Sequence, residues 1–161
     1  MKIGRWMWLW LASVAMLTLS VHAETVVIAN VQNANFNLTA EQVLKIFMGK
    51  LTRLPNGVAI KPLDQPDGSV RDAFYLTLTG KSAAQIKTYW SRQMFTGQAQ
   101  PPAEAISAED VVTQISKNPN LIGYVDKALL GDKPVIVLLA LGGNGTEESV
   151  KGEDDSISVY K

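Results

Sequence analysis

Apolar residues form two patterns along the chain: continuous runs, and positions three and four residues apart. Residues 25–31 and 134–141 are almost continuously apolar and rich in branched side chains, which is typical of strands covered on both faces. Shorter apolar runs at 58–63 and 122–125 predict two more strands. Apolar positions spaced three and four residues apart predict helices over residues 39–47, 70–78, 83–95 and 108–116.

The residues between these elements predict where the helices begin. Thr39 and Gln42 fit a capping box, and Ser69, Ser82 and Ser107 each stand just before a helical period, as N-cap residues do. The stretch 97–105 has neither a continuous apolar run nor apolar residues at helical spacing, and is predicted to be a loop. The order strand, helix, strand, three helices, strand, strand indicates an α/β domain with a small mixed sheet flanked by helices.

Both ends of the chain differ from this pattern. Lys2 and Arg5 precede an apolar run, and small residues before Glu24 fit a signal peptidase site. We therefore expect residues 1–23 to be a signal peptide, although an uncleaved anchor remains open, and the protein to be periplasmic. Residues 142–161 are Gly-rich and acidic, which predicts a disordered tail after a domain at 24–141.

Composition narrows the available chemistry. The chain has no Cys, and its one histidine, His22, lies in the predicted signal peptide. The mature domain therefore lacks the residues for His- or Cys-based nucleophilic catalysis and for Cys/His zinc or haem ligation. The mature charge is close to balanced, which argues against a nucleic-acid partner. No cofactor is expected.

The candidate site is the turn between the second predicted strand and the helix after it. With Ser69 as N-cap, the first helical turn presents unpaired backbone N–H groups, and the helix dipole adds partial positive charge there. Gly68 allows close approach, Asp67 and Val70 flank the turn, and Arg71 can reach back to a bound oxyanion. The alternative is an ordinary turn and cap with a solvated arginine.

Three ordered motifs resemble the periplasmic phosphate-binding proteins of ABC transporters. The segments IFMGKLTR at 46–53, DGS at 67–69 and NPNLIGYV at 118–125 are similar to that family's IFxGKITxW, RxDGSGT and PGAIGYV. The resemblance implies a type-II periplasmic-binding-protein fold and an oxyanion held by Ser and Arg side chains and by helix-terminal N–H groups. It also implies a membrane transporter as partner.

The chain departs from this family pattern in two respects. Gln65 stands in place of the family's Arg, and Val70 with Arg71 replaces its Gly-Thr, so we infer that the charge has moved to Arg71. The chain is also long enough for only one of the family's two lobes. A ligand on one lobe stays partly solvated, so we expect weak binding unless a second chain supplies the missing wall.

Two functions from different classes follow from these observations. The first is an exported solute-binding-like protein that recognises phosphate or a similar small oxyanion through residues 65 and 67–71, linked to ABC-type phosphate uptake. The alternative is a non-catalytic interaction domain that docks onto a membrane sensor or transporter and keeps a vestigial anion pocket. A Mg²⁺ or carboxylate cluster of Asp64, Asp67 and Asp72 is a distant third, so we expect no enzyme.

Overall fold

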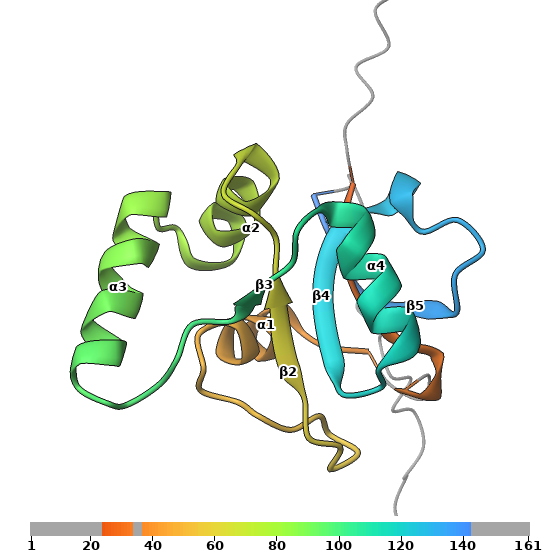
Figure 1. The fold of residues 1–161 in the computed structure, drawn as a ribbon, viewed down its shortest axis with the longest axis horizontal. Coiled ribbons are helices and arrows are strands. Elements are labelled where there is room, and N and C mark those ends of the chain that lie inside the picture. The colour runs from red at the N-terminus through yellow and green to blue at the C-terminus, as the bar shows by residue number, and fades with distance from the viewer. Residues whose placement is uncertain (1–23, 34–36, 143–161) are drawn as a thin grey trace, which may run out of the picture.

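The computed structural model describes residues 24–33 and 37–142 of the chain (Figure 1). The predicted signal peptide and the predicted tail beyond Gly142 lie outside these residues. Among the described helices, none is both long enough and apolar enough to cross a membrane.

Five strands and four α-helices make up the described domain, with two short 3-10 turns at Val31–Asn33 and Lys127–Leu129. The strands are β1 (Thr25–Asn30), β2 (Lys61–Asp64), β3 (Ala103–Glu104), β4 (Leu121–Asp126) and β5 (Val135–Leu141). The helices are α1 (Ala40–Phe47), α2 (Ser69–Thr79), α3 (Ala83–Phe95) and α4 (Ala108–Lys117). The predicted α/β class is confirmed.

The strands form one mixed sheet in the order β3-β2-β4-β1-β5. β1 lies between β4 and β5 and runs antiparallel to both, whereas β2 runs parallel to β3 and β4. The helix α4 covers one face, and α3 lies at the far end of the molecule from β5 (Figure 1). β3 falls within the stretch predicted to be a loop, because a strand of two residues has no detectable period.

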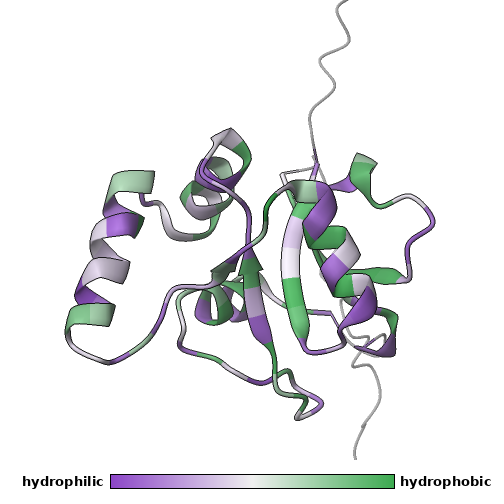
Figure 2. Ribbon diagram, in the orientation of Figure 1, coloured by the Kyte–Doolittle hydropathy of each residue, from purple (hydrophilic) through white to green (hydrophobic). Residues whose placement is uncertain are grey.

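The sheet has a hydrophobic core on each face. Alternate residues of β1 divide between the two cores: Val27 and Ala29 join the larger one, which includes α1, α2 and α3, and Val26 and Ile28 join the smaller one under α4. This division explains the continuous apolar run of β1, since both of its faces are covered. Figure 2 shows hydrophobic residues along the central strands and hydrophilic residues recurring along the helices.

Candidate functional site

Two helices begin at the same end of the sheet. β2 leads into α2 and its parallel neighbour β3 leads into α4, so both helix N-termini follow the carboxyl ends of adjacent parallel strands. The two starts share one surface depression of about 260 Å³, which residues 65–71 line together with Ser107 and Ala108. The structure thus brings all six predicted site residues to this depression.

The helix α2 begins one residue earlier than predicted. Its N-cap is Gly68, whose carbonyl accepts the first intrahelical bond from the Asp72 N–H at 3.0 Å. Ser69 is therefore the first helical residue, and the prediction that it is the N-cap is wrong. Gly68 has an extended backbone (φ 164°), and a Cβ there would meet nothing closer than the Pro66 carbonyl oxygen at 3.9 Å. Neither the backbone nor the packing requires glycine at this position.

The N-terminus of α2 has no side-chain cap. In contrast, Thr39, Ser82 and Ser107 each accept a hydrogen bond from the first turn of α1, α3 and α4, as their sequences predicted. The first-turn N–H groups of α2 thus have no side-chain acceptor among the described residues, and the residues that carry them line the depression. Such a terminus presents aligned donors and partial positive charge to an anion.

Arg71 is already held by two carboxylates. Its Nε donates to Asp64 at 3.0 Å and its Nη1 donates to Asp67 at 2.8 Å. Burial by itself lowers the pKa of Arg71, but the charge of Asp64 and the hydrogen bond to it outweigh burial and raise that pKa. These bonds occupy two of the five guanidinium N–H groups, so the side chain has donors to spare but little net positive charge to offer.

The other predicted residues differ in accessibility. The Asp67 side chain is 90% exposed, Ser69 is exposed, and Val70 is 38% exposed. Gln65 is buried, and its Nε2 donates to the Tyr124 carbonyl at 2.7 Å. Gln65 therefore ties the end of β2 to β4, while Ser69 and Val70 remain open to a ligand.

Sequence reasoning missed the structural role of Asp64. Its buried carboxylate accepts hydrogen bonds from Arg71, from the hydroxyls of Tyr75 and Tyr124, and from the Gln65 backbone N–H. These donors come from α2, from β4 and from the end of β2, so one carboxylate connects three elements. Asp64 thereby fixes how α2 leaves the sheet.

The two tyrosines on Asp64 are strongly perturbed. The pKa of Tyr75 and that of Tyr124 are raised far above the ordinary value. Burial is the largest cause, and the negative charge of Asp64 and the hydrogen bond to it add to the shift. Both hydroxyls therefore remain donors throughout the physiological range of pH.

This network predicts a steep loss of stability in alkali. The unfolded chain releases tyrosine protons from about pH 10, whereas the native state keeps them, so stability is full below pH 10 and falls as pH rises towards the raised pKa values. Each of the two tyrosines should contribute about 1.4 kcal/mol of loss per pH unit above pH 10. Urea unfolding at several pH values above 10 measures how steeply the free energy of unfolding falls with pH. Tyr75→Phe or Tyr124→Phe should remove one such contribution, and an unchanged dependence on pH in both variants would contradict the prediction.

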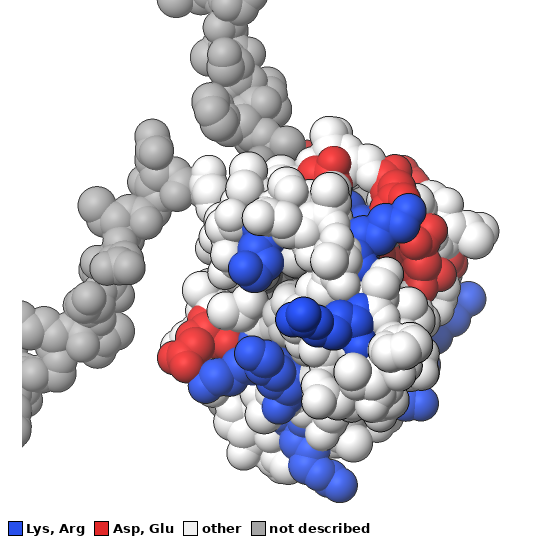
Figure 3. Space-filling model, turned by 90° about the vertical axis from the view of Figure 1, so that its left-hand side faces the viewer, with Lys and Arg blue, Asp and Glu red and all other residues white. Residues whose placement is uncertain are grey.

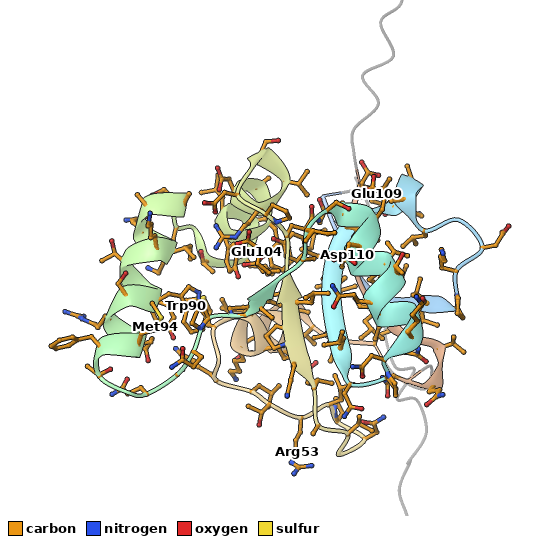
Figure 4. All side chains as sticks on the ribbon, in the orientation of Figure 1. Arg53, Trp90, Met94, Glu104, Glu109 and Asp110 are labelled. Carbon is orange, nitrogen blue, oxygen red and sulfur yellow. The ribbon has the colours of Figure 1, made fainter. Side chains whose placement is uncertain are left out.

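Two carboxylates lie in the first turn of α4. Figure 4 shows Glu109 and Asp110 there, whereas Glu104 lies towards α2 and α3. Hydrogen bonds from its own backbone N–H and from Ser107 lower the pKa of Glu109, and Asp110 accepts from the Ile106 N–H at 3.1 Å. The N-terminus of α4 is therefore satisfied by its own residues, and α2 is the open one. No group of three or more His, Cys, Asp or Glu side chains in the described ranges could hold a metal ion.

Solved structures share this fold. A protein described as a phosphate ABC transporter substrate-binding protein from Clostridium perfringens, with bound phosphate, is 24% identical with a TM-score of 0.54, and the match covers 72% of this chain and 45% of that one. PstS from Borrelia burgdorferi is 17% identical with a TM-score of 0.54, covering 72% of this chain and 47% of that one. No protein-family model and no curated protein sequence matches.

These likenesses establish the fold. The chain spans less than half the length of the structures that it matches. The predicted similarity to one lobe of a phosphate-binding protein is confirmed.

Proposed function

We propose that this protein is an exported solute-binding-like module that binds phosphate, or a similar small oxyanion, at the N-terminus of α2. The observation that carries the proposal is the uncapped first turn of α2, which opens onto a depression at the carboxyl ends of parallel strands. The fold shared with a protein solved with bound phosphate supports the same ligand. We further propose a link to ABC-type phosphate uptake and no catalytic role.

The contacts of the proposed site come mainly from the backbone. The N–H groups of Ser69 and Val70 and the Ser69 hydroxyl donate to the anion, and Arg71 adds one of its remaining N–H groups. Asp67 and Asp64 offset the charge of Arg71, so oriented dipoles supply most of the attraction. Because the depression is open to solvent on this single lobe, we expect a dissociation constant on the order of 1 mM.

Ser69→Pro tests the backbone contact directly. Proline is well tolerated at the first helical position, and the preceding Gly68 is extended as proline requires, so the fold should survive while one N–H and the hydroxyl are lost. Phosphate binding, measured by calorimetry at constant ionic strength, should weaken about 10- to 100-fold. Ser69→Ala, which removes only the hydroxyl, should have a smaller effect.

A matched substitution controls for effects on helix stability. Ala40→Pro introduces proline at the exposed first position of α1, also after an extended residue, and should leave phosphate affinity unchanged. At 10 mM phosphate the unmodified protein should gain about 1.4 kcal/mol of stability if the dissociation constant is 1 mM. Unchanged affinity in Ser69→Pro would refute this site.

The alternative function is docking without a ligand. Val70, which lines the depression, is 38% exposed, and Ile106, which precedes Ser107 in the chain, is 88% exposed. In this alternative, a membrane transporter or sensor covers these two apolar side chains. Absence of any response to phosphate or sulfate at millimolar concentration would reject the solute-binding role and favour docking.

A further inference from the structure

The outward face of α3 combines basic charge with an exposed aromatic side chain. Lys81, Lys87 and Arg92 are exposed, and none of them forms an ion pair within the described part of the chain. Phe95 is 94% exposed. These four residues are called the α3 face below. Met94 is 45% exposed, but it lies on the side of α3 that faces α2, where it lines a depression with Trp90.

The α3 face is free of negative charge along its own segment. The sequence contains no Asp or Glu from residue 73 to residue 103, which covers all of α3. Figure 3 views this end of the molecule: Lys and Arg occupy the middle of the face, and Asp and Glu lie towards its left and upper right edges. Asp67, Asp72 and Glu104 of neighbouring elements line a depression together with Lys87, on the side of α3 that faces α2. The positive potential is therefore directed outward through Lys81 and Arg92.

Helical geometry places the apolar and basic side chains together. Ile86 and Trp90 point into the core, and at about 100° per residue Phe95 lies opposite Ile86, with Lys87 on one side and Arg92 on the other. Lys81 and Arg92 also line a shallow depression of about 460 Å³ beside Tyr89. An exposed aromatic ring flanked by cations, next to a basic depression, suits a surface with both apolar chains and phosphodiester groups.

We propose that the α3 face binds the surface of an anionic phospholipid bilayer. Phe95 inserts at the level of the headgroups, Lys87 and Arg92 contact lipid phosphates on either side of it, and Lys81 with Arg92 holds a headgroup in the depression. Figure 1 shows α3 at one end of the molecule, where a flat bilayer meets no other element first. The proposal uses other residues than the anion site on α2, although Lys87 lines a depression together with Gly68 and Arg71 of that site.

Charge removal on the α3 face tests the proposal. The chain from Glu24 to Lys161 is used, because it contains every described element and omits the apolar run near the N-terminus. It should sediment with vesicles of phosphatidylcholine containing 30% phosphatidylglycerol but not with phosphatidylcholine alone. Each base near an anionic surface contributes about five-fold, so Lys81→Gln, Lys87→Gln and Arg92→Gln combined should weaken binding about 100-fold.

A triple variant elsewhere provides the matched control. Lys117→Gln, Lys127→Gln and Lys133→Gln together remove the same charge near α4 and β5, at the opposite end of the molecule, and should bind vesicles nearly as the parent does. Phe95→Ser should weaken binding about 10-fold even at high salt, since it removes an apolar contact. Circular dichroism melting confirms that each variant is folded.

The outcomes separate this proposal from its competitors. Absence of binding to anionic vesicles at 50 mM salt would overturn it, as would equal losses in the two triple variants. Free phosphate should compete no better than chloride of equal ionic strength, and stronger competition would also overturn it. Ser69→Pro should bind vesicles normally. Lys81→Gln combined with Arg92→Gln, which leaves Lys87 beside Gly68 and Arg71 unchanged, should bind phosphate normally, so failure of either proposal is distinguishable from failure of the other.

Discussion

Replacing Asp64 by alanine is expected to lower the free energy of unfolding by about 3 to 5 kcal/mol. The substitution leaves the Arg71 side chain, which is only 16% exposed, without its buried partner. It also leaves the hydroxyls of Tyr75 and Tyr124 without an acceptor inside the core, and each such group costs about 1 to 3 kcal/mol. The midpoint of urea unfolding, at unchanged slope, measures this loss.

Asp67→Ala is the matched control for this prediction. Asp67 is the same residue type and pairs with the same arginine, but its side chain is 90% exposed, so its removal should cost less than about 1 kcal/mol. Asp64→Asn should fall between the two, because the amide oxygen still accepts one hydrogen bond. Similar small losses in Asp64→Ala and Asp67→Ala would show that the buried network does not hold α2 in place.

The sequence predicted most elements because their signals are local. The continuous apolar runs of β1 and β5 and the caps Thr39, Ser82 and Ser107 are set by neighbouring residues, and the structure contains them. β3 was missed, and with it the convergence of α2 and α4. Had residues 103–104 been predicted as a strand parallel to β2, Ser107 would have been expected beside Ser69.

The role of Asp64 could not be predicted in the same way. One of its donors, Tyr124, lies 60 residues away in sequence, and no period or motif links the two. The sequence placed Arg71 correctly near the turn but could not show that Asp64 and Asp67 already bind it. Local patterns indicate where a charged side chain lies, whereas the fold decides which partners it finds.

Gly123→Ala is expected to destabilise the domain by about 3 kcal/mol, because β4 and α4 are in contact at this glycine. A Cβ there would lie 2.7 Å from Val111 Cγ1, 2.8 Å from Ile115 Cδ1 and 3.3 Å from the Leu63 carbonyl oxygen. Val111 and Ile115 are fully buried, and valine in a helix has one strongly preferred rotamer, so the methyl group of Val111 cannot turn away cheaply. The helix α4 must instead move off the sheet.

Two variants show whether crowding is the cause. Val111→Ala added to Gly123→Ala makes room for the new methyl group, so the double variant should be more stable than Gly123→Ala alone, although Val111→Ala by itself destabilises. Gly68→Ala, where a Cβ meets nothing within 3.4 Å, should cost no more than about 1 kcal/mol. Equal urea midpoints for Gly123→Ala and Gly68→Ala would contradict this. Because Ser107 is the N-cap of α4, a shift of α4 in Gly123→Ala should also widen the depression at the start of α2 and weaken the phosphate binding that we propose there.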